Sequence, residues 1–127
     1  MNRKITVITG DTENLIMNGL NKMVDNKVIS FENTKYIHFP EVLKHPKVYC
    51  GDLKEKIAEN NNSKFIILTF SDNIVNLLGG MIEENKLSKD EIELKIITED
   101  NIINCTYTEE GYLDEGYPIG YFNYEEL

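Results

Sequence analysis

The chain has 127 residues, of which 41% are hydrophobic, and its formal net charge is −9. This length fits one domain with a modest core, and the composition is typical of a folded protein rather than a disordered one. The negative charge argues against a surface for nucleic acid or anionic membranes, because their phosphates would be repelled. No apolar run approaches the roughly 18 residues of a membrane span, and the N-terminus lacks a signal-type apolar core, so we expect a cytoplasmic protein.

Cysteine and histidine spacing indicates no metal centre. Cys50 and Cys105 are expected to be unpaired buried thiols. The sequence has no CxxC pair and no Cys/His cluster of the kind that binds zinc. His38 and His45 lie seven residues apart, and we expect packed or surface roles for them rather than metal binding. The sequence therefore predicts neither a metal nor a cofactor.

The first element pair is a strand followed by a helix. Residues 4–9 (KITVIT) predict a buried strand that Gly10 breaks, and either Asp11 or Thr12 would cap the helix. The apolar face of this helix is predicted to comprise Leu15, Ile16, Leu20, Met23 and Val24.

Two further strands and two helices follow. Residues 35–39 (KYIHF) predict a strand closed by Pro40, and residues 52–60 predict a helix with Leu53 and Ile57 inward. Residues 64–70 (KFIILTF) form an unbroken apolar run, which is typical of an inner parallel strand covered on both faces. Either Ser71 or Asp72 would cap a helix over 73–85 whose predicted inward residues are Ile74, Leu77, Leu78, Met81 and Ile82.

The last elements predict an antiparallel hairpin. Residues 88–91 (SKDE) have capping-box spacing, and they form either a capping box or only a turn. Residues 92–99 alternate as a strand with one open face would, and residues 101–109 alternate likewise, with a tight turn at 100–101. The order of elements predicts an α/β fold: a three-layer, mainly parallel sheet with flanking helices that ends in an antiparallel hairpin.

The C-terminal stretch, residues 110–127, is rich in aromatic and acidic side chains. It is either a packed C-terminal wrap or a protein-binding surface, because Tyr and Phe are frequent in such surfaces. The candidate contact residues are Tyr112, Tyr117, Tyr121, Phe122 and Tyr124.

Three stretches in order resemble the nucleotide-binding domain of ABC-type ATPases, above all the OLD-like and AAA-type ATPases of phage defence and plasmid systems. ITVITGDTENLIMNGL (5–20) is similar to the strand, phosphate loop and first helix. KYIHFPEVLKHP (35–46) is similar to the strand that ends in two acids, and KFIILTFSDNIVNLL (64–78) to the strand that ends in Thr-His-Ser. The tail, with its Pro-Ile-Gly-Tyr-Phe run, resembles the end of one subgroup. The likeness spans nearly all of residues 1–127 and implies one truncated ATPase head, a reduced P-loop NTPase-like core without the helical subdomain and the Leu-Ser-Gly-Gly signature.

The resemblance also implies that the phosphate loop is degenerate. With Gly10 at the first glycine, Glu13, Leu15, Ile16 and Met17 stand where the family has Gly, Gly, Lys and Ser/Thr. Capture of a triphosphate needs backbone N–H groups, an ammonium and a hydroxyl on Mg²⁺. The degenerate loop, which runs through Gly10, Asp11, Thr12, Glu13, Asn14, Leu15, Ile16 and Met17, is therefore expected not to bind nucleotide.

The positions for hydrolysis are replaced as well. His38 and Phe39 match the two acids, and Phe70 matches the γ-phosphate-sensing His. Glu41 matches the family's Glu after Pro, which is not the base itself. Because a carboxylate must hold Mg²⁺ and another must polarise water, we expect no catalytic residue and no enzyme activity.

Three hypotheses for function remain. The first is a pseudo-ATPase interaction module that binds itself or a true ABC/OLD-type ATPase as a subunit, decoy or inhibitor, in a role that would suit a phage or mobile element. The second is a small regulator with weak residual nucleotide or anion binding at the Gly10 turn, where a helix N-terminus still offers N–H groups. The third is an unrelated α/β enzyme, which a deep acid-lined pocket would favour.

Overall fold

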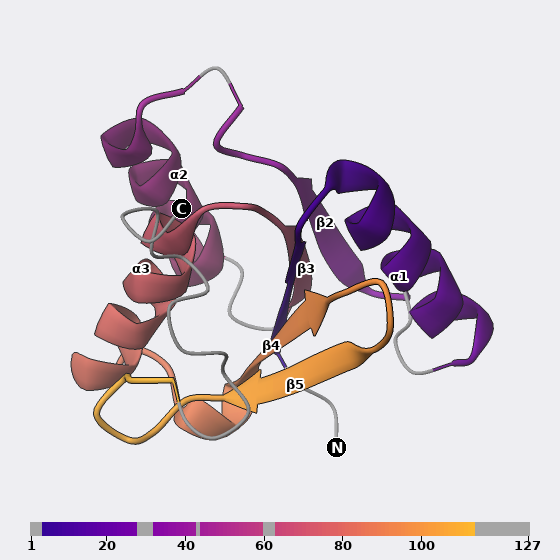
Figure 1. The fold of residues 1–127 in the computed structure, drawn as a ribbon. Coiled ribbons are helices and arrows are strands. Elements are labelled where there is room, and N and C mark those ends of the chain that lie inside the picture. The colour runs from indigo at the N-terminus through magenta and orange to yellow at the C-terminus, as the bar shows by residue number, and fades with distance from the viewer. Residues whose placement is uncertain (1–3, 28–31, 43, 60–62, 114–127) are drawn as a thin grey trace, which may run out of the picture.

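The computed structural model describes residues 4–27, 32–42, 44–59 and 63–113. These residues form an α/β fold in which one sheet lies between two layers of helices (Figure 1). The strands are β1 (Ile5–Gly10), β2 (Thr34–His38), β3 (Lys64–Leu68), β4 (Ile92–Ile97) and β5 (Ile102–Thr106). The helices are α1 (Glu13–Asp25), α2 (Pro46–Glu59) and α3 (Asp72–Glu83), and a 3-10 turn, η1 (Lys89–Glu91), precedes β4. The predicted three-layer α/β architecture is confirmed.

The five strands lie in the order β2-β3-β1-β4-β5. β2, β3, β1 and β4 are parallel neighbours, and β5 returns antiparallel to β4. All six residues of β1 are buried, because this strand has a neighbour on each side and helices on both faces. The apolar runs of β1 and β3 follow from this position, since an inner parallel strand contacts the core on both sides.

The helices divide between the two faces of the sheet. α1 covers one face, and α2 and α3 cover the other (Figure 1). This division follows from right-handed crossovers, because the chain moves one way along the sheet from β1 to β2 and the other way from β2 through β3 to β4. Among the described residues, no helix combines the length and the apolar character needed to cross a bilayer.

The N-terminal helix agrees with its sequence pattern. Thr12 is its cap, and the Thr12 Oγ1 accepts a hydrogen bond from the Leu15 N–H at 3.1 Å. Four residues of α1 are buried against the sheet, namely Ile16, Gly19, Leu20 and Met23. α3 begins after Ser71, which occupies the cap position without a side-chain capping bond.

The start of α2 was predicted wrongly. The helix begins at Pro46, whereas the sequence pattern placed its start at residue 52. Val48, Tyr49 and Gly51 have low helix propensity, which hid the first turns. Burial of Tyr49 in the core overrides that propensity, and proline suits the first helical position because its missing N–H has no intrahelical partner there.

The open face expected for β4 is also wrong. The Lys95 side chain lies on that face but is only 6% exposed. Its Nζ donates a hydrogen bond to Asn104 Oδ1 at 2.7 Å and lies 3.6 Å from Glu93 Oε1. β4 is an inner strand, so its polar residues are satisfied within the sheet rather than by bulk water. The turn between β4 and β5 is centred on Glu99 and Asp100, one residue earlier than predicted.

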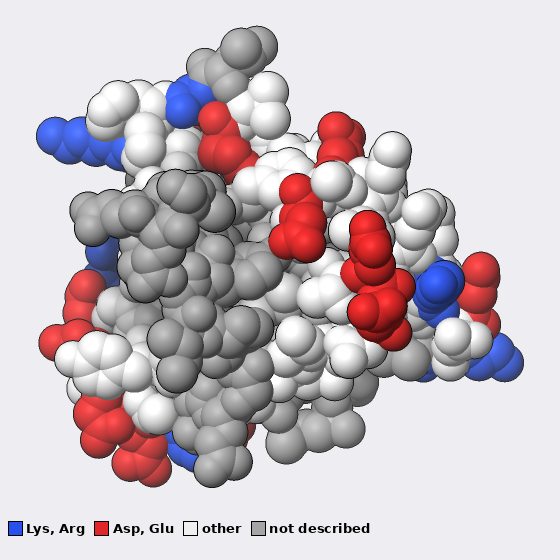
Figure 2. All heavy atoms as spheres, in the orientation of Figure 1, with Lys and Arg blue, Asp and Glu red and all other residues white. Residues whose placement is uncertain are grey.

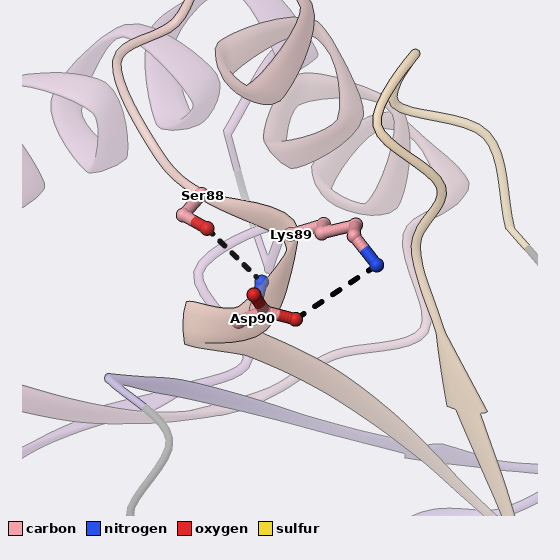
Figure 3. A network of polar contacts seen from close by, with 3 residues as sticks. All are labelled: Ser88, Lys89 and Asp90. Atoms are coloured by element: carbon pink, nitrogen blue, oxygen red, sulfur yellow. Dashed lines mark hydrogen bonds and ion pairs between the residues drawn. The ribbon is translucent and has the colours of Figure 1, made fainter.

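The predicted capping box at η1 is confirmed. Ser88 Oγ accepts a hydrogen bond from the Asp90 N–H at 3.3 Å, and Glu91 Oε1 accepts one from the Ser88 N–H at 2.8 Å. Figure 3 shows the Ser88–Asp90 bond and the neighbouring Lys89–Asp90 ion pair, whose atoms are 3.9 Å apart. This turn satisfies the backbone donors just before the chain enters β4.

Candidate functional site

The carboxyl ends of β1 and β3 mark the position where an open α/β sheet usually binds a ligand. The chain leaves β1 toward α1 on one face and leaves the adjacent β3 toward α3 on the other face (Figure 1). Such a reversal opens a crevice between two neighbouring strands. We call the surface formed by the residues that follow β1, β2, β3 and β4 the carboxyl edge.

The turn after β1 is too short to enclose a phosphate. Only Asp11 and Thr12 separate Gly10 from the start of α1. The Leu15 and Ile16 N–H groups donate to Thr12 Oγ1 and to the Thr12 carbonyl oxygen, so two donors of the first turns are already used. A phosphate loop instead needs several free N–H groups arranged around the anion.

Gly10 has a packing role in this turn. A Cβ atom at this position would lie 2.8 Å from the Ile97 carbonyl oxygen and 3.0 Å from Ile16 Cγ1. The glycine therefore permits close contact between β1, β4 and α1, which explains its presence without a bound ligand.

The positions that match the family's Lys and Ser/Thr serve the core and the surface of α1. Ile16 is fully buried, and it packs with residues of β1, β3 and β4. Met17 is half-buried, and its Sδ accepts a hydrogen bond from Tyr36 Oη at 3.8 Å. Neither side chain carries a charge or an oxygen for a metal ion.

Two aromatic residues meet where β2 and β3 end. The rings of Phe39 and Phe70 stack with centroids 4.9 Å apart and an angle of 17° between planes. The His38 ring lies edge-on to Phe39, with centroids 4.6 Å apart. Phe39 is only 6% exposed. The structure thus brings together residues of two degenerate motifs, His38 and Phe39 from one and Phe70 from the other.

Phe39 adopts an unusual backbone conformation. Its φ is +45°, in the left-handed region that a bulky residue rarely occupies. The Phe39 N–H donates to the Leu68 carbonyl oxygen at 2.8 Å, which holds the residue beside β3. Backbone strain of this kind is often found at functional sites.

Glu41 is held in place by the end of β3. Its Oε2 accepts a hydrogen bond from Thr69 Oγ1 at 2.8 Å, and its Oε1 accepts one from the Phe70 N–H at 2.8 Å. Thr69 Oγ1 in turn accepts from the Ser71 N–H at 2.9 Å. The carboxylate therefore clamps the segment after β2 to the segment after β3, and both of its oxygens are engaged.

A second polar group lies at the start of α3. Tyr49 Oη and Ser71 Oγ are hydrogen-bonded at 2.7 Å, and Asn73 Nδ2 donates to Tyr49 Oη at 3.2 Å. The Tyr49–Ser71 bond connects α2 to the start of α3, and it explains why the Ser71 side chain does not cap α3.

Thr9 Oγ1, near the end of β1, is buried and has no hydrogen-bond partner within the described ranges.

The carboxyl edge is acidic. Asp11 and Glu13 lie at the start of α1, and Glu99 and Asp100 form the turn after β4. The two segments are neighbours, because Ile97 at the end of β4 pairs with Gly10 at the end of β1. All four side chains are exposed. Figure 2 shows Asp and Glu side chains spread over this part of the surface. Such a field repels a nucleotide and attracts a basic surface.

The remaining candidates do not join this group. Tyr112 is 72% exposed and lies in the turn after β5, where its N–H donates to Thr108 Oγ1. Four other aromatic candidates, Tyr117, Tyr121, Phe122 and Tyr124, lie outside the described residues. His45 Nδ1 accepts a hydrogen bond from the Lys47 N–H at 3.1 Å. In the described segments, no three His, Cys, Asp or Glu side chains are grouped as a metal would require.

Sequence reasoning missed the clamp role of Glu41 and the contact between Phe39 and Phe70. The Pro-Glu pair after β2 was the signal for Glu41, but its partners lie 28 and 29 residues later in the chain. Nothing in the spacing of the two phenylalanines indicates that they touch.

Comparison with protein-family models, curated proteins and solved structures found no match for this chain. Its function therefore has to be inferred from its own residues and their geometry.

Proposed function

We propose that this chain is a non-catalytic, ATPase-head-like interaction module of the cytoplasm that binds a related ATPase, or a second copy of itself, through the carboxyl edge. The observation that supports this most is the Phe39–Phe70 stack, because the two positions that match the water-polarising acid and the phosphate-sensing His are closed against each other.

Hydrolysis of a nucleotide would need carboxylates at the positions of His38 and Phe39, and neither residue carries one. Glu41, which does not match the family's base, has both oxygens engaged by hydrogen bonds from the end of β3. The turn at Asp11 and Thr12 leaves no loop to surround phosphates. Since catalysis of phosphoryl transfer depends on positioning and charge stabilisation, the loss of all these groups leaves no route to it.

The same surface is suited to a protein partner. Heads of the family that the chain resembles pair face to face around ATP, and the carboxyl edge corresponds to that face. Its exposed carboxylates favour a partner with basic side chains. Two copies with a net charge of −9 each would repel one another, which favours a different protein, such as a true ATPase, over self-association.

A capture experiment with charge-reversed variants tests the proposal. The tagged chain should retain an ATPase with an intact phosphate loop from lysate of its host, identified by mass spectrometry. The variant Glu13→Lys/Glu99→Lys should lose this partner, whereas Glu83→Lys/Glu109→Lys, which reverses two exposed charges elsewhere, should retain it. Recovery of no ATPase would contradict an ATPase as the partner, and equal recovery with both variants would contradict the carboxyl edge as the binding surface.

Calorimetry separates this function from residual nucleotide binding at the Gly10 turn. With ATP, ADP or GTP and Mg²⁺, we expect no heat of binding up to about 1 mM ligand, which corresponds to less than about 4 kcal/mol of binding free energy. Saturable binding that Gly10→Ala removes without unfolding the chain would favour the regulator hypothesis instead.

A further inference from the structure

The turn after β2 places a bulky residue in an unfavourable backbone conformation. In the described part of the chain, four residues other than glycine have a positive φ. Lys27 and Asn85 follow the C-termini of α1 and α3, where this conformation commonly ends a helix, and Asn33 is of a residue type that tolerates it. Phe39, with a φ of +45°, has neither explanation.

Pro40 increases the strain at Phe39. The residue before a proline favours extended backbone with a φ near about −120°, because of steric conflict with the proline ring. The Val42 N–H donates a hydrogen bond to the Phe39 carbonyl oxygen at 3.2 Å and closes a turn over these four residues. We call residues 39–42 the β2 turn. Its first residue is unfavourable on two counts, so contacts elsewhere have to maintain the conformation.

Contacts with the end of β3 supply this restraint. Glu41 accepts hydrogen bonds from Thr69 Oγ1 and from the Phe70 N–H, both at 2.8 Å. The Phe39 and Phe70 rings stack with their centroids 4.9 Å apart. Hydrogen bonds to a charged acceptor are stronger than neutral ones, so together with the stacked rings they outweigh the strained φ.

The strain and the restraint belong to one short segment and are therefore coupled. Rotation of Phe39 about its N–Cα bond to a negative φ would redirect the chain that follows and withdraw the Glu41 carboxylate from β3. The segment thus has two alternatives: either Glu41 is bound and Phe39 is strained, or Phe39 is relaxed and Glu41 is free. Val42, at the end of the β2 turn, is 58% exposed, so few contacts at that end oppose the movement.

We propose that the β2 turn is a latch that opens and closes while the rest of the protein stays folded. In the closed arrangement Glu41 binds the end of β3. In the open arrangement the Glu41 carboxylate and the rings of Phe39 and Phe70 become accessible at the carboxyl edge. A partner that binds only the open arrangement would hold the latch open. This use of the latch rests on the proposed function, whereas the opening itself does not.

Hydrogen exchange at two neighbouring amides tests the latch without any partner. The Phe70 N–H donates to Glu41, whereas the Thr69 N–H donates to the Ile8 carbonyl oxygen within the sheet at 3.1 Å. In low urea, and after correction for intrinsic rates, we expect the Phe70 amide to exchange at least about tenfold faster than the Thr69 amide, at a rate independent of urea. Equal protection with equal urea dependence would overturn the proposal, because the turn would then open only when the sheet unfolds.

Two variants separate local opening from unfolding. Glu41→Gln weakens the closed arrangement, so it should raise exchange at Phe70 about tenfold. Gly79→Ala disturbs the contact of α3 with Gly111, beyond the β5 side of the sheet, and the open arrangement keeps that contact. It should therefore raise exchange at Thr69 about tenfold and leave Phe70 unchanged.

The outcomes of these measurements are distinct. The latch is refuted if Gly79→Ala raises exchange at both amides equally, or if Glu41→Gln leaves the Phe70 amide unchanged. Where a variant does not fold, the urea series on the parent chain decides. A chain whose latch opens but which captures no ATPase would contradict the proposed partner and leave the latch standing.

Discussion

Phe39 and Phe70 stack with their ring centroids 4.9 Å apart, although Phe39 adopts a φ of +45° to reach this position. The left-handed conformation costs a residue with a Cβ atom about 1–2 kcal/mol. The packing of the rings offsets this cost and closes the end of β2 against the end of β3. The stack therefore combines an unfavourable backbone conformation at Phe39 with an apolar contact between the ends of β2 and β3.

Because of this strain, we expect glycine to be more stable than alanine at position 39, the reverse of the usual order. Phe39→Gly and Phe39→Ala both remove the ring, but only glycine relieves the backbone, so Phe39→Gly should be more stable by about 1 kcal/mol. Urea unfolding followed by circular dichroism measures the difference. At Tyr36 in β2, whose φ is not positive, the order should be the usual one, with alanine more stable than glycine. A Phe39→Ala variant equal to or more stable than Phe39→Gly would refute the strain.

The Glu41 clamp predicts a loss of stability in Glu41→Gln. The amide oxygen can accept from the Phe70 N–H, but the NH₂ group cannot accept from the Thr69 hydroxyl, which must turn to accept from it, and the charge is lost from both hydrogen bonds. We expect the free energy of unfolding to fall by about 1.5–3 kcal/mol. Glu13→Gln, an exposed position on α1, should change it by less than about 1 kcal/mol. Equal losses of unfolding free energy at positions 41 and 13 would show that the two Glu41 hydrogen bonds do not stabilise the fold.

Gly79 and Gly80 are neighbours in α3, and we expect their substitution by alanine to affect stability differently, because only Gly79 contacts Gly111. A Cβ on Gly79 would overlap the Gly111 carbonyl oxygen, whereas a Cβ on Gly80 would meet no atom within 4 Å. Gly79→Ala should therefore destabilise the chain by about 1–3 kcal/mol through overpacking. Gly80→Ala should be neutral, or stabilising by up to about 1 kcal/mol, because alanine favours a helix. Thermal unfolding of both variants checks this, and a mild effect at Gly79 would contradict the close backbone contact.

Thr9 and Thr69 predict opposite effects of the same substitution. Thr9 is 0% exposed and its hydroxyl has no partner in the part of the chain that the structure describes, so Thr9→Val should stabilise the fold by about 1–2 kcal/mol. The Thr69 hydroxyl donates to Glu41 and accepts from the Ser71 N–H, so Thr69→Val should destabilise it by a similar amount. Chemical unfolding of both variants decides the matter. If Thr9→Val is destabilising, the Thr9 hydroxyl has a partner after all, such as a buried water.

The two thiols should differ in reactivity. Burial raises the pKa of both Cys50 and Cys105, so at pH 8 both are mostly protonated and react slowly with iodoacetamide. Cys105 is fully buried and should be alkylated only when the core opens, whereas Cys50 is partly exposed and should react first. Mass spectrometry of peptides over a time course follows each thiol, and a rate at Cys105 equal to that in urea would contradict its burial.

Much of the fold could be predicted from local patterns. The apolar runs of β1 and β3 and the periodicity of α1 and α3 are confirmed, because burial on both faces or on one helical face leaves a direct trace in the residue order. The start of α2 and the burial of Lys95 were not predictable, since both depend on partners elsewhere: the core around Tyr49 and the amide of Asn104 on β5.

The residue order by itself determined the α/β class and the positions of the motifs, because hydrophobic period and turn residues act over a few neighbours. Which of those positions meet was decided only by the tertiary structure. Phe39 reaches Phe70, and Glu41 reaches Thr69, across about thirty residues of chain. Such contacts arise when parallel strands bring their carboxyl ends to one edge, a proximity that sequence spacing does not encode.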